Sequence, residues 1–227
     1  VQDIGGNTIT THNGGTVTAT IRDDATYANP TGAALYGTAT VAIVNGFAKF
    51  DGLYISVAGS PYVISFVADL ELSGPTVVYS NPFAVGVGAA FQLVFKAAPS
   101  DGAIVAGQAF AVQPKLRVLD AGGNLLVADS SSTVRCDFLA NPSGGTLSPA
   151  TSTTRQLVSG EVSFSLLSID FTGARYALRF TLYRYDVLTG SYEAAITAAA
   201  PNGVSINTEY FTVLLGVPKQ VRVTTTP

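Results

Sequence analysis

The sequence predicts an all-β protein whose short strands fold into sandwiches or barrels. Apolar and polar residues alternate with a period of two in runs such as Thr16–Ile21, Tyr62–Val67 and Tyr176–Leu182. Val, Ile, Phe, Tyr and Thr dominate these runs, and Gly, Asn, Pro or Ser residues bound each of them. No window shows apolar residues at helical spacing between helix caps. Many closely spaced strands without intervening helices indicate a sandwich or a barrel.

The composition narrows the class of protein. The 227 residues are 47% hydrophobic and 12% charged, with a formal net charge of −3. This apolar content is sufficient for one large core or two modest ones, and it excludes a disordered chain. Because a pI near 5.0 leaves no basic surface for phosphates, we expect no nucleic-acid partner. Polar residues and glycines interrupt the uncharged stretch 77–95, so we also expect no membrane insertion.

An internal repeat predicts two domains of the same fold. The offset between matching segments is 117 residues at the start, 114 in the middle and 128 at the end. Because the offset changes only between strands, the repeat indicates one fold with loops of variable length. The longer loop, 182–207, is expected to hold an inserted hairpin around Leu188–Ser191. The matching pairs are 1–7 with 118–124, 45–55 with 159–169, 59–66 with 173–180, and 83–95 with 211–223.

Motifs of the second repeat resemble those of bacterial-type Ig-like repeats. They are Gln92-Leu93-Val94-Phe95, Ala106–Phe110, Val118–Asn124, Gly144–Ser148, Gly160–Phe164 and Gly173–Tyr176. This family occurs as tandem arrays in large extracellular proteins such as adhesins, stalks and fibres. The resemblance therefore implies two tandem Ig-like β-sandwich domains and an extracellular or cell-surface location.

The register of the repeat divides the chain into three parts. Residues 89–216 form a complete Ig-like domain, whereas residues 1–88 begin only at the Asp3 turn and lack the first strand and most of the second. Residues 217–227 repeat the opening strand with no domain behind it. We expect this spare strand to complete the first domain of a neighbouring unit, because an open sheet edge tends to recruit another strand.

The spare strand predicts a structural subunit that assembles head to tail with copies of itself. Val217, Val221 and Val223 share one face, while Gln220 and Arg222 point outward. Lys219 is the remaining residue of the predicted subunit interface. Eleven residues span at most about 36 Å, too short to return past two sandwiches placed end to end, so insertion between copies is expected. Such a contact does not close on itself and yields a filament or fibre. The rival interpretation is one period of a longer covalent array.

The sequence offers little for chemistry, so we expect neither an enzyme nor a cofactor. His12 is the only histidine and lies in a turn, where an exposed loop position is expected rather than a metal site. Cys136 alternates with apolar neighbours and is expected to be a buried small hydrophobic residue. Asp3–Asn7 and Asp120–Asn124 fit turns better than calcium loops, because they lack alternating carboxylates and a closing Glu.

A second function remains open, that of an adhesin or glycan-binding spacer module. It would need a localised surface patch, and the inserted segment offers Tyr183, Tyr185 and Tyr192. Packing within the core or the hairpin is the simpler explanation of these residues. If they are exposed, a surface glycan is the expected partner.

Overall fold

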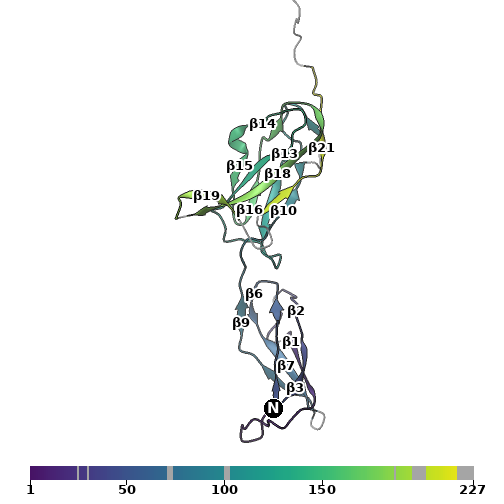
Figure 1. Cartoon of the computed structure of the whole chain (residues 1–227), viewed down its shortest axis with the longest axis vertical. Coiled ribbons are helices and arrows are strands. Elements are labelled where there is room, and N and C mark those ends of the chain that lie inside the picture. The colour runs from purple at the N-terminus through teal and green to yellow at the C-terminus, as the bar shows by residue number, and fades with distance from the viewer. Residues whose placement is uncertain are drawn as a thin grey trace, which may run out of the picture. The chain divides into compact units, whose positions relative to one another are not determined.

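The computed structural model describes residues 1–24, 26–29, 31–70, 74–99, 103–186, 188–195 and 203–218. These residues form strands and short 3-10 turns such as η2 (Ala150–Ser152), and they contain no α-helix, which confirms the all-β prediction. The chain forms two compact units (Figure 1). Unit 1 comprises 1–87 together with 122–124, and unit 2 comprises 88–121 and the chain from 125 onward.

Unit 1 is built on one five-stranded antiparallel sheet with the order β4-β3-β1-β7-β8. Two small pairs, β2 with β5 and β6 with β9, extend it. The strands are β1 (Thr16–Ile21), β2 (Leu35–Tyr36), β3 (Thr40–Val44), β4 (Phe47–Ala48), β5 (Tyr54–Ile55), β6 (Gly59–Tyr62), β7 (Ile64–Asp69), β8 (Thr76–Tyr79) and β9 (Phe83–Val85).

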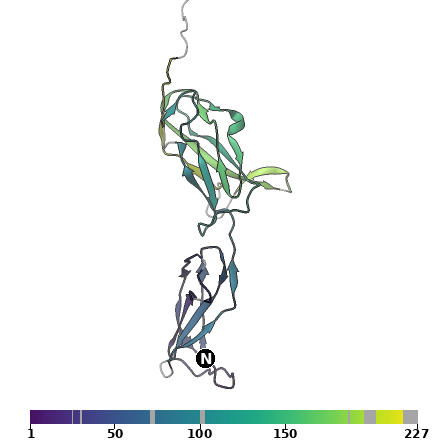
Figure 2. The same ribbon diagram turned by 180° about the vertical axis from the view of Figure 1, so that it is seen from behind.

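Unit 2 has two main sheets, with the orders β10-β12-β16 and β11-β21-β18-β13-β15 (Figure 2). β11 runs parallel to β21, and the other paired strands are antiparallel. The strands are β10 (Gln92–Ala97), β11 (Ile104–Val105), β12 (Lys115–Leu119), β13 (Thr133–Ala140), β14 (Leu147–Ser148), β15 (Thr154–Gln156), β16 (Glu161–Ser163), β17 (Ser168–Ile169), β18 (Gly173–Asp186), β19 (Ser191–Ala194), β20 (Ser205–Asn207) and β21 (Phe211–Leu214).

The core of unit 2 lies between its two main sheets. Apolar residues from both sheets form one buried cluster, and the alternation of the sequence identified many of them. Alternation in the sequence predicts thirteen core residues within 89–216. Those that are buried are Leu93, Val118, Val134, Cys136, Val162, Phe164, Tyr176, Leu178, Phe180 and Val213. Three further predicted residues, Phe95, Phe138 and Phe211, are partly buried and pack against the cluster.

The same hydrogen bonds occur within each unit, at positions that match in the sequence. The Tyr62 hydroxyl donates to the Val57 carbonyl at 3.0 Å, and the Tyr176 hydroxyl donates to the Phe171 carbonyl at the same distance. Both rings are fully buried. The hairpin turns also match, because Gly46 and Gly160 have φ angles of 78° and 76°, in the left-handed region that favours glycine.

The two units differ in what precedes their matching strands. β13 of unit 2 follows β10, β11 and β12, whereas residues 1–15 of unit 1, all of which the structure describes, contain no strand before β1. Val1 still occupies the position of Val118. Its amine donates to the Gly46 carbonyl, as the Val118 N–H donates to the Gly160 carbonyl at 2.9 Å. Val1 and Gln2 of unit 1 therefore correspond to the end of β12.

Candidate functional site

One face of the main sheet of unit 1 forms an apolar groove of about 550 Å³. None of the side chains that line it is charged. They come from the N-terminal segment and from β1, β3, β4, β7 and β8: Val1, Gln2, Thr8, Val17, Ile43, Gly46, Phe47, Ala48, Phe66, Ala68, Leu70, Thr76 and Val78.

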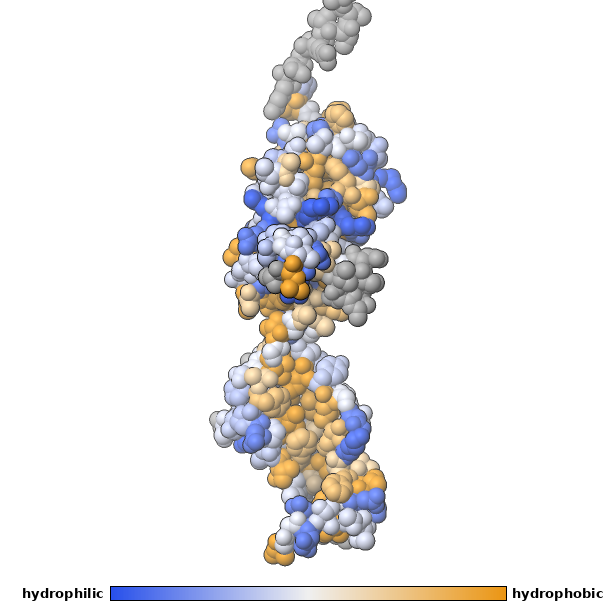
Figure 3. All heavy atoms as spheres, turned by 60° about the vertical axis from the view of Figure 1, so that its left-hand side comes forward, coloured by the Kyte–Doolittle hydropathy of each residue, from blue (hydrophilic) through white to orange (hydrophobic). Residues whose placement is uncertain are grey.

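Strand register explains why these residues form a continuous surface. Phe66 and Ala68 are two positions apart on β7, so their side chains lie on the same face of the sheet. On the adjacent β8 their partners are Val78 and Thr76, and Val17 of β1 pairs with Ala68 from the other side. Figure 3 shows apolar residues gathered in a broad band over unit 1.

In unit 2 the corresponding face is covered. Phe180, the counterpart of Phe66, is fully buried and contacts the rings of Phe95 at 5.4 Å and Phe164 at 5.2 Å between centroids. Phe66 is only partly buried, and its ring contact among the described residues is Phe50 at 5.4 Å. Phe50 matches Phe164, so the missing neighbour corresponds to Phe95 of β10.

The exposure of the surrounding residues shows the same difference. Val78 is 59% exposed and Phe47 is 62% exposed, which is unusual for large apolar residues on a sheet. Val17 is partly buried, whereas its counterpart Val134 is fully buried beneath the second sheet. The groove therefore lies where β10 and β12 cover the sheet in unit 2.

The edge of β4 is also open. β4 pairs with β3 on one side, and no other strand of the described residues pairs with it. Its counterpart β16 pairs with β12 through Leu116 and Val162 and their neighbours. Unit 1 thus presents both an apolar face and a strand edge where unit 2 has another sheet.

The structure describes little of the predicted spare strand. Val217 is 78% exposed. Lys219, Gln220, Val221, Arg222 and Val223 lie outside the described residues.

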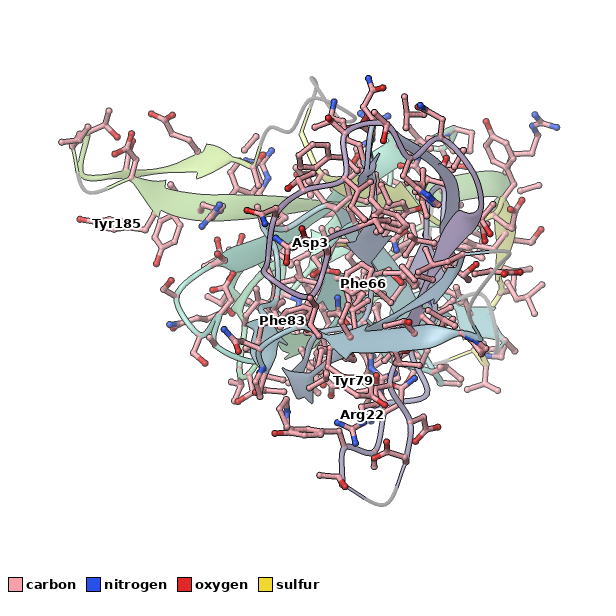
Figure 4. All side chains as sticks on the ribbon, turned by 90° about the horizontal axis from the view of Figure 1, so that it is seen from below. Asp3, Arg22, Phe66, Tyr79, Phe83 and Tyr185 are labelled. Carbon is pink, nitrogen blue, oxygen red and sulfur yellow. The ribbon has the colours of Figure 1, made fainter. Side chains whose placement is uncertain are left out.

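The inserted segment of unit 2 contains the predicted hairpin. β19 pairs with the end of β18, and residues 188–190 lie in the turn between them. Tyr185 and Tyr192 are directly opposite one another, with ring centroids 5.3 Å apart, and are 49% and 48% exposed. Tyr183 is partly buried, with the Arg135 guanidinium 5.4 Å from its ring centroid. Figure 4 shows Tyr185 on the projecting hairpin.

A cluster around Arg22 was not found from the sequence. The guanidinium lies 4.2 Å from the ring centroid of Tyr79 and 5.0 Å from that of Tyr27 (Figure 4). It also donates to the Asp24 carboxylate, and this hydrogen bond lowers the pKa of Asp24. The alternating run ends at Ile21, so only the acidic residues that follow could have pointed to Arg22.

The Asp3 segment forms a turn, as the sequence indicated. The Asp3 carboxylate accepts the backbone N–H groups of Gly5 at 2.9 Å and Asn7 at 2.8 Å. The amide of Asn7 also donates to it, and these bonds lower the pKa of Asp3. Gly6 has a φ angle of 84°, which is the reason for glycine at this position. All of these bonds come from within the turn, three to Oδ1 and one to Oδ2.

The structure corrects the prediction for His12. We expected an exposed loop histidine, but His12 is partly buried, and its Nε2 atom is buried without a hydrogen-bond partner among the described residues. Its backbone explains this position, because the His12 N–H donates to Ile9 and the His12 carbonyl accepts from Gly46. These bonds tie the loop to the β3–β4 turn.

Cys136 is buried as predicted, at 1% exposure, and burial raises the pKa of its thiol. In the described part of the chain, no group of three or more His, Cys, Asp or Glu side chains could hold a metal ion.

Comparison with known proteins gives no family. No protein-family model matches the chain, and no curated protein matches it. No helix among the described residues is long and apolar enough to cross a bilayer.

Proposed function

We propose that this chain is a structural subunit of an extracellular filament, stalk or surface fibre. Copies join head to tail when the C-terminal strand of one copy, 217–227, enters the groove of unit 1 in the next. The partners are thus copies of the chain itself. Both units are Ig-like β-sandwiches in this proposal, unit 2 complete and unit 1 short of its first strands.

The open groove of unit 1 carries the proposal. It lies where β10 and β12 cover the sheet in unit 2, and the C-terminal segment repeats the sequence of β10. Val221 matches Leu93 and Val223 matches Phe95, so the strand would present two apolar residues to the open face. A groove without charged side chains suits such an occupant, because burial of each valine contributes about 1.5–3 kcal/mol.

Two further features support the Ig-like assignment. A buried tyrosine near the start of a strand, whose hydroxyl binds a carbonyl a few residues upstream, is a hallmark of Ig-like sandwiches. Tyr62 and Tyr176 both make this bond, each to a residue five positions earlier. The parallel pairing of β11 with β21 beside antiparallel sheets is consistent with the same architecture.

Sedimentation velocity and negative-stain microscopy of the purified chain test the proposal. We expect long assemblies from the full chain and monomers after deletion of 217–227. Val223→Asp should prevent assembly, because its charge would enter the apolar groove. Thr224→Asp is the matched control, since it adds the same charge on the outward face and should assemble normally.

Two results would contradict strand exchange: a full chain that stays monomeric, or assemblies that survive the deletion. Denaturing mass spectrometry of material from the natural source separates exchange between copies from a covalent array. Strand exchange predicts single chains, and an array predicts a much larger mass.

The Tyr185–Tyr192 pair favours a second candidate function, an adhesin or glycan-binding spacer. Exposed aromatic rings on a projecting hairpin can stack on sugar rings. A glycan array tests this function. Specific binding that is lost in Tyr185→Ala and Tyr192→Ala but retained in Tyr54→Ala, a similarly exposed tyrosine of unit 1, would favour it.

A further inference from the structure

A hydrogen bond within unit 2 links Gly88, three residues after the end of β9, to the turn after β12. The backbone N–H of Gly88 donates to Oδ2 of Asp120 at 2.7 Å. Asp120 is only 4% exposed, and a buried carboxylate usually has hydrogen-bond partners. The Gly88 N–H is one of them. This bond therefore fixes where the chain enters unit 2, just before β10 begins.

The repeat places Asp3 where Asp120 lies. The N–H of Leu126 donates to the Val118 carbonyl at 3.1 Å, and the N–H of Ile9 donates to the Val1 carbonyl at 3.0 Å. The isolated bridge between Leu119 and Leu125 recurs between Gln2 and Thr8. The segments around Asp3 and Asp120 thus have the same local backbone structure.

The repeat also places Gly216 where Gly88 lies. β21 pairs with β18 through Phe211 and Tyr176, and β9 pairs with β6 through Phe83 and Tyr62, with an irregularity at the matching position. Gly216 follows Phe211 by five residues, as Gly88 follows Phe83. The chain therefore leaves the two units in the same way.

We infer that Asp3 of one copy accepts a hydrogen bond from the backbone N–H of Gly216 of the preceding copy. This inference rests on the proposed function, and it adds the residue that fixes the register of the incoming strand. Asp3 is exposed in the single chain, as a residue awaiting a partner strand would be. Its Oδ1 atom accepts both backbone N–H groups of the turn, whereas Oδ2 accepts only the Asn7 side-chain amide, at 3.0 Å. A carboxylate oxygen can accept a second hydrogen bond, so Oδ2 is the atom that corresponds to the acceptor in Asp120.

This contact would hold the incoming strand in one register. In unit 2, Gln92 pairs with Leu119 and Leu93 with Val118. By the same register Gln220 lies opposite Gln2, and Val221 lies opposite Val1. Val223 would then contact Phe66, as Phe95 contacts Phe180 in unit 2. A shift by one residue would turn the valines outward, so the Asp3 contact distinguishes the productive register from its neighbours.

Two matched pairs of full-length variants test the contact by the critical concentration for assembly. Asp3→Asn keeps an oxygen at Oδ1 for the turn but replaces the Oδ2 acceptor with an amide donor. Asp51→Asn is its control, because it makes the same change in charge at a side chain that is 77% exposed. Gly216→Pro removes the donor, whereas Gly216→Ala keeps it. An added Cβ there would meet Val105 at 3.4 Å and Ala106 at 3.5 Å, which is ordinary contact.

We expect Asp3→Asn and Gly216→Pro each to raise the critical concentration roughly ten- to a hundredfold, the effect of losing a hydrogen bond to a charged group. The double variant should raise the critical concentration no more than either single variant, because both substitutions remove the same hydrogen bond. Asp3→Asn also removes the hydrogen bond from the Asn7 side-chain amide to Oδ2, so the thermal unfolding temperature of unit 1 should fall slightly. Asn7→Ala removes that turn bond but keeps the Asp3 carboxylate, so it should assemble normally.

The inference is overturned, and strand exchange stands, if both variants assemble like their controls while deletion of 217–227 abolishes assembly. It is also overturned if Asp3→Asn and Gly216→Pro have additive effects. A full chain that never assembles would overturn both the inference and the proposed function.

Discussion

Truncation of matching phenylalanines in the two units measures how open the groove is. We compare Phe66→Ala with Phe180→Ala in a chain that lacks 217–227, so that no copy can fill the groove. The two residues match in the repeat and differ in what covers them. Phe180 is fully buried between two rings, whereas Phe66 is partly buried against one.

The expected costs follow from this packing. Phe180→Ala should destabilise unit 2 by about 3–5 kcal/mol, the usual cost of removing a fully buried phenylalanine. Phe66 lacks one aromatic pair, which is worth about 0.5–1.5 kcal/mol. Phe66→Ala also removes less buried area than Phe180→Ala, because the side of the Phe66 ring that faces the groove is already in contact with water. We therefore expect about 2 kcal/mol for Phe66→Ala, roughly half the cost in unit 2.

Differential scanning calorimetry checks the comparison, since each substitution identifies the transition of its own unit. A loss of 2 kcal/mol should lower the melting temperature of unit 1 by roughly 8–16 °C. Equal costs at the two positions would refute the reasoning, because Phe66 would then be fully packed in the isolated chain. In assembled full-length protein, the cost of Phe66→Ala should rise toward that of Phe180→Ala.

Three further predictions concern the folded units themselves. Tyr62→Phe and Tyr176→Phe should each lower the stability of their own unit by about 1 kcal/mol in urea unfolding, because each removes a buried hydroxyl bond. Cys136 should react with a thiol reagent at pH 8 far more slowly in the native chain than in urea, because burial raises its pKa and blocks access; equal rates would contradict this. Glu161 has a pKa below its ordinary value of 4.5, owing to hydrogen bonds from Arg117 and Lys96. Its contribution to stability is present above that value and is lost as the pH falls through the lowered pKa, so acid melts of Glu161→Gln should show a weaker pH dependence.

Local features of the fold follow closely from the sequence. The alternating run Thr16–Ile21 coincides with β1, and Asn45-Gly46 and Ser159-Gly160 form the hairpin turns that their residue types favour. These features depend on side-chain period and on backbone angles, which neighbouring residues determine. The predicted run Tyr62–Val67 is less exact, because β6 ends at Tyr62 and β7 begins at Ile64.

Burial in unit 1 could not be predicted in the same way. Alternation indicates which face of a strand points inward, but exposure depends on whether another layer covers that face. Val17 and Val134 have the same pattern around them and differ in burial. The position of His12 likewise depends on hydrogen bonds that reach the β3–β4 turn from a distant part of the chain.

The repeat provides an internal control for the groove. Two segments of the same chain with matching sequence and matching hydrogen bonds differ in the exposure of Phe66 and Phe180, and of Asp3 and Asp120. Residue type cannot cause these differences, since the residues are identical at each matched position. The strands that cover unit 2, and the Gly88 N–H that binds Asp120, are what unit 1 does not itself supply in the described residues. A segment with the sequence of β10, preceded by a glycine, would supply the first of these strands together with the N–H donor, and residues 216–227 have this pattern.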